Sequence, residues 1–289
     1  MKTYSQIQGD GGSRIVEQVG AQQAALEQRL SLVKRIIAVA SGKGGVGKSA
    51  IAAGLAQAFA LRGRAVGMVD ADLNGPSVTR MLGVEKGVLA RGVEGISPVV
   101  APLEIKTVSM DFLIEDGRPV EWQTLSQESF VWRGTKEMTV LREFLSDTQW
   151  GSLDVLIVDC PPGSDRLDNM RAVLPLRTEV VLVVTPSYAA RQVVARSATL
   201  LKSLPFSMRG VVENMGAYHC RACGHADPLL GGDRGEEFAR ALGMPFLGTV
   251  PFDPVLNASL DRGEPFLVHH SDRPSATAIL SIANTLMNV

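Results

Sequence analysis

Residues 41–49 read Ser-Gly-Lys-Gly-Gly-Val-Gly-Lys-Ser. This string matches the pattern G-x-x-x-x-G-K-S/T, a loop whose backbone N–H groups surround nucleotide phosphates. Residues 35–40 are an apolar, β-branched run typical of a buried parallel strand, and residues 49–61 are Ala/Leu-rich and predict a helix. A strand, a glycine loop and a helix N-terminus together form an anion-binding site. The predicted nucleotide-binding residues of this loop are Gly42, Lys43, Gly44, Gly45, Val46, Gly47, Lys48 and Ser49.

The rest of the chain alternates between strand and helix signals. Short apolar runs that predict buried strands lie at residues 64–69, 105–110, 154–158, 180–184, 209–212 and 246–250. Helices are expected at residues 135–145 and 275–287, and the Gly-, Pro- and Val-rich residues 85–104 are expected to form short strands or loops. Such alternation predicts an α/β fold with a doubly wound, mostly parallel sheet, helices on both faces, and ligands at the carboxyl ends of the strands.

A helical pattern precedes the first strand. Apolar residues recur at helical spacing between residues 13 and 33, which predicts an amphipathic helix. We expect this helix to pack on the flank of the domain, because it has too few heptads for a coiled coil. We therefore divide the chain into a lead-in with this helix, residues 1–34, and one P-loop domain, residues 35–289, which carries a C-x-x-C pair near residues 220–223.

The composition excludes several classes of protein. Hydrophobic residues make up 45% of the 289-residue chain and charged residues 20%, as in an ordinary soluble globule. The net charge of −1 offers no basic field for nucleic acid, and no apolar run reaches the roughly 18–20 residues of a membrane span. Three cysteines are too few for a disulfide framework. We therefore expect a cytoplasmic protein that binds neither nucleic acid nor membrane.

Asp159 ends the apolar run at residues 154–158. A carboxylate at this point of a P-loop sheet can hold a magnesium ion beside the phosphates. Ser49 would offer its hydroxyl to the same ion, and Lys48 its charge to the β- and γ-phosphates.

Two further acids, Asp70 and Asp72, follow the strand predicted at residues 64–69. Alternation along an extended chain points both in the same direction, at the sheet edge that carries the glycine loop. Helix capping or a solvated loop is the alternative interpretation of this pair.

Two later segments resemble base-recognition loops. Asn214 follows the strand predicted at residues 209–212 and offers an amide that can pair with a purine edge. Pro251 and Asp253 follow the strand predicted at residues 246–250. Each segment alone could be a simple turn, but their joint position behind these strands favours contact with the nucleotide.

The second lysine of the glycine loop, Lys43, is not needed to bind phosphate. With it, the loop resembles the deviant Walker A class of ATPases, which contains MinD, ParA and the nitrogenase iron protein. The resemblance implies ATP as the nucleotide, Asp72 as the residue that positions or activates the attacking water, and a Lys43 that reaches the nucleotide of a partner subunit; a solvated loop lysine is the alternative. The predicted catalytic residues are then Lys43, Lys48 and Asp72, and the predicted magnesium residues are Ser49, Asp70 and Asp159.

Cys220 and Cys223 form a C-x-x-C pair followed directly by Gly224. Two thiolates at this spacing can bind one soft metal centre, but they supply only half of a tetrahedral site. His219 or His225 could complete a zinc site within one chain, or a second chain could supply two more cysteines. A redox disulfide and an unliganded pair are the remaining alternatives.

Taken together, the chain resembles iron–sulfur cluster carriers of the Mrp/ApbC type between about residue 35 and residue 268. The resemblance rests on SGKGGVGKS (41–49), DADLNGPS (70–77), VWRG (131–134), LDVLIVDCPPG (153–163), ENM (213–215), CRAC (220–223) and FLGTVPFD (246–253). It implies that Cys220 and Cys223 of each subunit hold a 4Fe-4S cluster across a homodimer interface. It also implies ATP hydrolysis and transfer of the cluster between assembly scaffold proteins and apo iron–sulfur proteins.

Two segments depart from the family pattern. Residues 164–166, Ser-Asp-Arg, stand where the family usually has Thr-Gly-Asp, and the segment after Pro186 lacks the usual acidic residue. We therefore expect slow ATP hydrolysis. The alternatives are a positioning or partitioning ATPase of the MinD/ParA kind and a zinc-stabilised nucleotide-binding scaffold.

Overall fold

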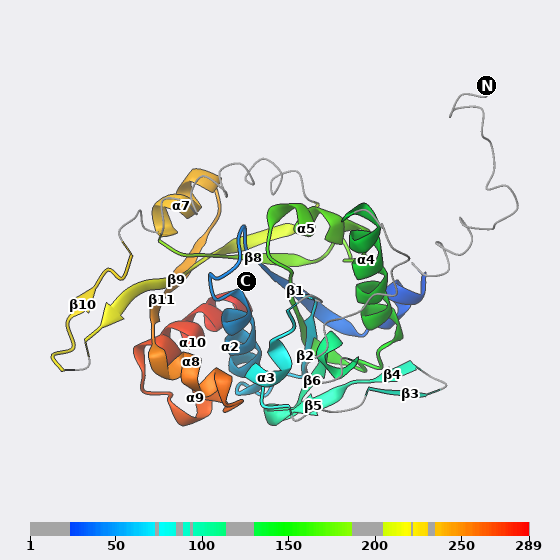
Figure 1. Ribbon diagram of the computed structural model, residues 1–289, viewed down its shortest axis with the longest axis horizontal. Helices are drawn as coiled ribbons and strands as arrows, with labels where there is room; N and C mark the ends of the chain where they lie inside the picture. The colour runs from blue at the N-terminus through cyan, green and yellow to red at the C-terminus, as the bar shows by residue number, and fades with distance from the viewer. Residues whose placement is uncertain are drawn as a thin grey trace, which may run out of the picture.

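The computed structural model describes residues 24–72, 75–84, 89–92, 95–113, 130–186, 205–220, 222–230 and 235–288. Within these residues the main sheet has nine strands in the order β10-β9-β8-β1-β7-β2-β6-β5, with β11 also paired to β9 (Figure 1). Its parallel strands are β1 (Val33–Ala40), β2 (Val66–Asp70), β6 (Ile105–Val108), β7 (Leu153–Asp159), β8 (Glu179–Val184), β9 (Ser207–His219) and β11 (Phe246–Phe252). The predicted mostly parallel α/β fold is therefore confirmed.

The antiparallel strands lie at the margins. β5 (Val99–Ala101) pairs with β6, and β10 (Ala226–Asp227) pairs with the end of β9. β3 (Ala90–Gly92) and β4 (Gly95–Ser97) form a separate two-stranded sheet.

The helices follow the order of an alternating α/β chain. Residues 24–30 are helical. The longer elements are α2 (Lys48–Ala60), α4 (Phe130–Asp147), α7 (Gly235–Leu242), α8 (Pro254–Asp261) and α10 (Pro274–Met287). The shorter ones are α3 (Val78–Met81), α5 (Ser164–Asn169), α9 (Phe266–His269) and the 3-10 turns η2 (Pro102–Glu104), η3 (Met110–Leu113) and η4 (Met170–Ala172).

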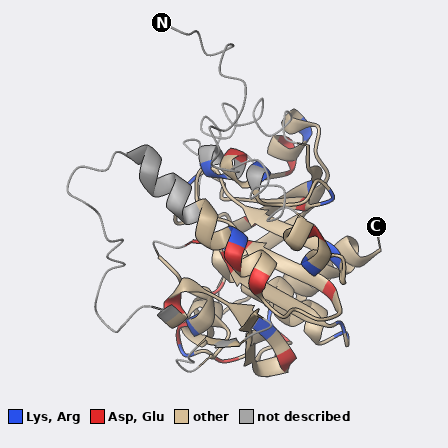
Figure 2. Ribbon diagram, turned by 90° about the vertical axis from the view of Figure 1, so that its right-hand side faces the viewer, with Lys and Arg blue, Asp and Glu red and all other residues tan. Residues whose placement is uncertain are grey.

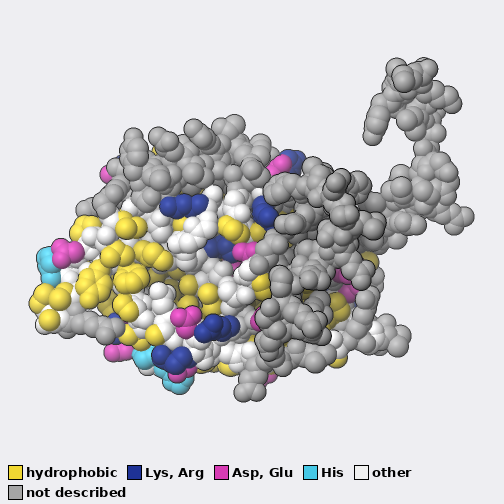
Figure 3. Space-filling view, in the orientation of Figure 1, with side chains coloured by type: hydrophobic (Ala, Val, Ile, Leu, Met, Phe, Trp, Pro, Cys, Tyr) yellow, Lys and Arg dark blue, Asp and Glu magenta, His cyan; other side chains and the backbone are white. Residues whose placement is uncertain are grey.

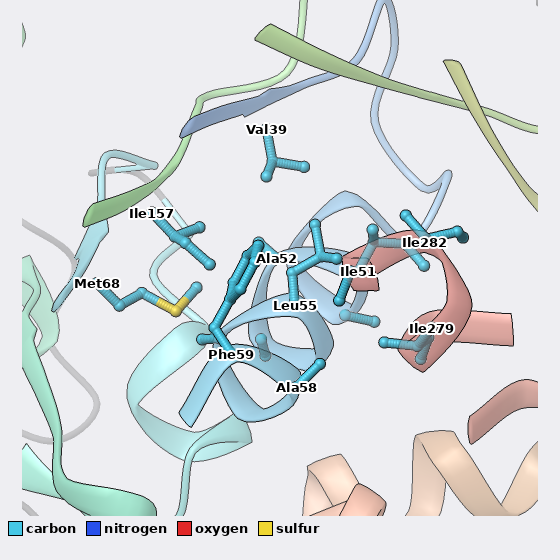
Figure 4. Packing of buried hydrophobic residues seen from close by; sticks show 14 of the residues in the cluster. Val39, Ile51, Ala52, Leu55, Ala58, Phe59, Met68, Ile157, Ile279 and Ile282 are labelled. Atoms are coloured by element: carbon cyan, nitrogen blue, oxygen red, sulfur yellow. The ribbon is translucent and has the colours of Figure 1, made fainter. Parts of the chain in front are cut away.

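Both faces of the sheet are buried, because successive strand residues point to opposite sides. In β1, Ile37 belongs to the hydrophobic cluster under α2 and α10, whereas Ile36 belongs to the cluster under α4, α7 and the helix at residues 24–30. Figure 4 shows Phe59 of α2 beside Met68 and Ile157 of the sheet, with the α10 side chains packed against α2. The cluster under α4 and α7 includes Leu26 and Leu30, both almost fully buried, so residues 24–30 share the core of the sheet.

Two predicted strand ends were wrong. β9 does not stop at residue 212 but continues to His219, because its second half pairs with β11 and β10. β11 likewise continues past Val250 to Phe252. Pro251 is tolerated there because the pairing of β9 and β11 is irregular at this point, so no regular hydrogen bond from residue 251 is lost.

Charges are mixed over the surface. Figure 2 shows Lys and Arg interspersed with Asp and Glu over the described part of this face. In that part of the chain, no helix is long and apolar enough to cross a membrane.

The packing of β2 gives a first testable prediction. A Cβ added to Gly67 would lie 2.6 Å from Leu153 Cδ1 and 2.8 Å from Leu156 Cδ1. We expect Gly67→Ala to lower the free energy of unfolding by about 1–3 kcal/mol, because an overpacked core must shift. Urea denaturation measures this loss.

Gly92→Ala in β3 is the matched control, since the nearest atom to its added Cβ is 3.9 Å away. We expect its stability to stay within about 0.5 kcal/mol of wild type. Equal losses in both variants would contradict the packing argument.

Candidate functional site

The phosphate loop lies between β1 and α2, as predicted. Gly45 and Gly47 have φ angles of 76° and 77°, in the left-handed region that glycine adopts without strain. α2 begins at Lys48, and no side chain caps its first N–H groups, which leaves them available to an anion. The loop lines a cavity of about 400 Å³ together with Asp72 and Pro162.

A buried ion pair joins this loop to the sheet. Lys48 Nζ contacts Asp159 Oδ1, and both side chains are almost completely buried. Burial raises the pKa of Asp159, although the charge and hydrogen bond of Lys48 act against this. Asp159 Oδ2 has no hydrogen-bond partner among the described residues, and Ser49 Oγ lies 3.3 Å from the same Lys48 Nζ.

These residues fit a magnesium ion. A buried carboxylate oxygen without a partner costs free energy, and an oxygen-binding cation at this position would satisfy it. Ser49 supplies a hydroxyl oxygen beside it, as phosphate-loop magnesium sites require.

Asp70 lies opposite Asp159 in the register of β2 and β7. Its carboxylate accepts hydrogen bonds from the N–H groups of Ser77 at 2.9 Å, Asp72 at 3.1 Å and Val78 at 3.2 Å. Burial, and then the nearby charge of Asp159, raise the pKa of Asp70 to about 7. Asp70 therefore holds the turn after β2 and the start of α3, which places Asp72 on the wall of the cavity; its role as a magnesium residue stays a prediction.

Of the two predicted base-recognition segments, one lies within β9 and the other spans the end of β11. Asn214 Nδ2 donates a hydrogen bond to the carbonyl of Val46 at 2.9 Å, so the side chain supports the phosphate loop from within β9. Pro251 lies inside β11, and the loop predicted after that strand begins only at Asp253.

Asp253 is engaged within the protein. Its carboxylate accepts from Val255 N–H at 2.9 Å and from Ser275 Oγ at 2.6 Å, and it pairs with Arg273. Burial acts to raise the pKa of Asp253, but the hydrogen bonds from Arg273 and Ser275 outweigh it and the pKa is lowered. Asp253 therefore caps α8 and ties it to α10, whereas its predicted contact with a nucleotide base stays a prediction.

The helix that Asp253 caps contributes residues that the sequence analysis missed. Asn257, Leu260 and Asp261 of α8 line the cavity, as does Met81 of α3. The three α8 positions recur at i, i+3 and i+4, which is one face of a helix. This spacing and the capping Asp-Pro before it were the available signals.

The cysteine pair lies in the turn between β9 and β10, at the end of the molecule farthest along β9 (Figure 1). Cys220 N–H donates to the His225 carbonyl at 2.9 Å, and Gly224 N–H donates to the Cys220 carbonyl at 2.8 Å. Gly224 has a φ of 72°, which the tight turn requires. We refer to residues 220–230 as the cysteine loop.

Both thiols of the pair are free and accessible. Cys223 is exposed and Cys220 is half-buried. The pKa of Cys220 is lowered, first by the N–H of Ala222 and then by the N–H and thiol of Cys223. The same N–H groups would stabilise a metal-bound thiolate.

A metal site completed within one chain finds no support in the described residues, where no group of three or more His, Cys, Asp and Glu side chains is placed to hold an ion. His225 Nε2 instead lies 3.2 Å from Asp227. Leu229 and Leu230 of the cysteine loop are each 38% exposed, and Figure 3 shows hydrophobic side chains gathered at this end of the molecule.

Comparison with known proteins identifies the family of the chain. The family described as ParA, NUBPL iron-transfer P-loop NTPase, matches residues 32–287. The chain is 38% identical over 278 residues to an iron-sulfur cluster carrier protein of Saccharolobus solfataricus, covering 96% of this chain and 90% of that protein. It is 41% identical over 267 residues to the cytosolic Fe-S cluster assembly factor nubp2 of Danio rerio, covering 90% and 96%.

Solved structures show the same fold. A nucleotide-binding protein from Archaeoglobus fulgidus in complex with ADP superposes with a TM-score of 0.68 and 34% identity, covering 84% of this chain and 91% of that one. The cell division ATPase MinD of Pyrococcus furiosus gives a TM-score of 0.62 at 22% identity, covering 88% and 99%, a likeness that concerns the fold alone.

The raised pKa of Asp70 predicts a pH dependence of stability. With its raised pKa, folded Asp70 keeps its proton up to about pH 7, whereas in the unfolded chain the carboxyl releases it near its ordinary pKa of 3.8. The folded state therefore binds more protons between these values, so the free energy of unfolding falls as the pH rises from about 4 to 7. In EDTA, we expect wild type to lose about 2–4 kcal/mol relative to Asp70→Asn over this range, measured by urea denaturation.

Asn removes one hydrogen-bond acceptor, which shifts the free energy of unfolding of Asp70→Asn by the same amount at every pH. This shift does not affect the change of stability with pH. Asp272→Asn, at an exposed position, is the matched control and should follow wild type. Parallel curves for wild type and Asp70→Asn would show that Asp70 ionises normally.

Proposed function

The chain belongs to the ParA family of iron-transfer P-loop NTPases, and on this premise we propose that it is an ATP-hydrolysing carrier that holds a 4Fe-4S cluster across a homodimer interface and transfers it to apoproteins. The match to this family and the names of the relatives confirm the resemblance to iron–sulfur cluster carriers that was stated from the sequence. The cluster itself is cargo, received from an assembly scaffold and passed on. A cytoplasmic location is supported by the likeness to nubp2 of Danio rerio, which is named a cytosolic assembly factor.

The observation that carries this proposal is the cysteine loop. One chain presents two accessible free thiols on a tight turn, with no third ligand near them among the described residues. A 4Fe-4S cluster takes four thiolates. Two copies of the loop, one from each subunit, supply that number, and the N–H groups directed at Cys220 favour the thiolate form.

The nucleotide site supports ATP binding and slow hydrolysis. The uncapped N–H groups of α2 and the charge of Lys48 bind the phosphates. Ser49 and Asp159, with Asp70 behind them, would hold the magnesium ion, which supplies neutralising charge to the phosphates when bound. Asp72, on the cavity wall, accepts a hydrogen bond from the attacking water and so orients it.

Nucleotide and cluster would then both shift the equilibrium between monomer and dimer. Lys43 lines the nucleotide cavity, and in the proposed dimer it reaches the nucleotide of the partner subunit. Because the cluster also joins the two subunits, each ligand favours the same assembly, and each must raise the affinity for the other by the same factor.

Anaerobic reconstitution with iron and sulfide tests the carrier proposal. We expect wild type to bind about four irons per dimer with a brown chromophore, and Cys220→Ala/Cys223→Ala to bind none, because the ligands are gone. Cys160→Ala is the matched control: this third thiol is fully buried, so its loss should leave the iron content unchanged. Zinc in place of iron, or cluster binding without Cys220 and Cys223, would overturn the proposal.

Sedimentation of Lys43→Ala tests the subunit-bridging lysine. We expect wild type to dimerise with ATP and Lys43→Ala to stay monomeric while it still binds ATP, because the contact to the partner's nucleotide is lost. Nucleotide binding is measured in the same samples. Undiminished ATP-dependent dimerisation of Lys43→Ala would assign this lysine to its own subunit.

A further inference from the structure

Three consecutive residues of β9, Glu213, Asn214 and Met215, lie between the phosphate loop and the cysteine loop. We refer to them as the junction. Glu213 and Asn214 are 6% and 5% exposed, and successive strand residues point to opposite faces. Beyond the junction, β9 runs directly on to His219 and the cysteine loop.

Glu213 holds the return of the chain after the cysteine loop. Its carboxylate accepts from the N–H of Gly235, the first residue of α7, and from Thr249 Oγ1 of β11 at 3.1 Å. Glu213 is closely packed against two glycines. A Cβ added to Gly216 would lie 2.4 Å from Glu213 Oε1, and a Cβ added to Gly235 would lie 2.7 Å from Glu213 Cβ. The entry and the exit of the segment that carries the cysteines are therefore joined at Glu213.

Asn214 holds the phosphate loop from the other face. Its Nδ2 donates the hydrogen bond to the Val46 carbonyl and lies so close to Gly47 that a Cβ added to Gly47 would be only 2.2 Å away. The loop and the strand are thus in direct contact without intervening space, so a displacement of Val46 or Gly47 must displace β9.

Met215 is the point where β9 changes course. Its φ of 60° lies in the left-handed region, which a non-glycine residue adopts under strain. The pairing with β11 shifts here, since Val250 is opposite Asn214 but Phe252 is opposite Tyr218. The Met215 Cε atom would lie 3.6 Å from a Cβ added to Gly47, so the strained residue lies close to the phosphate loop.

We propose that the junction is a positioning element that transmits nucleotide occupancy of the phosphate loop along β9 to the cysteine loop within one subunit. A bound phosphate fixes the backbone at Val46 and Gly47, these fix Asn214 and Met215, and the strand beyond the bulge then holds Cys220 in one place. This inference rests on the proposed function, because it assumes that the glycine loop binds nucleotide. It differs from coupling through a subunit interface, because it requires only contacts inside one chain.

Alkylation of the cluster-free full chain by iodoacetamide, with and without saturating ADP, tests this inference. Mass spectrometry follows the peptide of Cys220 and Cys223, with buried Cys160 as an unreactive internal reference. We expect ADP to slow alkylation of wild type by roughly fivefold or more, the lower end of common coupling strengths. In Asn214→Ala and Met215→Gly the rates with and without ADP should become equal at saturating ADP, because the contact or the strain that links the two loops is gone.

Three further variants and a sizing step complete the test. Asn284→Ala, an exposed position on α10, is the matched control and should keep the wild-type ratio. Glu213→Gln, which retains an acceptor for Gly235 N–H, should keep it as well, whereas Glu213→Ala should lose it. Sizing of each sample restricts the comparison to monomers, so protection by a partner subunit does not enter.

The outcomes separate the two proposals. If ADP binds to wild type but alkylation is equally fast with and without it, the junction proposal is overturned and the carrier proposal stays intact. The same holds if Asn214→Ala and Met215→Gly keep the wild-type ratio of the two rates. A wild type that binds no ADP would overturn both, whereas a failure of iron reconstitution would overturn the carrier proposal alone.

Discussion

The contact on which the rest of the structure depends is the buried ion pair between Lys48 and Asp159. Removing two charges from water is costly, and in a buried site each must find its partner with good geometry. Lys48 is the first residue of α2 and Asp159 the last of β7, so the pair fixes a helix against the carboxyl edge of the sheet. The register follows from it: Val39 and Asp70 each lie opposite Asp159, and a slip of one residue would send the carboxylate into the apolar core.

The same contact sets the electrostatics of the cavity. Asp159 and Asp70 lie opposite each other on β7 and β2, and the one lysine that pairs with them among the described residues, Lys48, contacts Asp159, so negative charge is in excess. Part of that excess is removed by a proton on Asp70, whose pKa is raised to about 7. A divalent cation bound there would remove it more completely and would give the unpartnered oxygen of Asp159 a ligand.

Local pattern was sufficient for the phosphate loop, the central strands and the class of fold, because glycines with positive φ and uniformly apolar strands are specified by neighbouring residues. It was insufficient where distant contacts decide. β9 continues past residue 212 because β11 pairs with its second half, and the mixed polarity of Glu213 to Tyr218 gives no alternating signal for that pairing. The hydrogen bonds that Asp253 accepts from Arg273, twenty residues away, and from Ser275 could not be read from the local sequence, and its contact with a nucleotide stays a prediction. The contribution of α8 to the cavity wall depends on that same long-range pairing.

The placement of the thiols determines which cysteines are oxidised first when the protein is exposed to air. Cys160 directly follows β7 and has no exposed surface, and burial raises its pKa to about 12, so oxygen-derived oxidants meet little thiolate there. Cys220 and Cys223 lie at the far end of β9, where oxidation reaches them without touching the core. Oxidative damage would therefore remove the proposed capacity to hold a cluster first and leave the nucleotide domain folded. Thiol reductants reverse such a lesion so long as it stops at a disulfide or sulfenic acid.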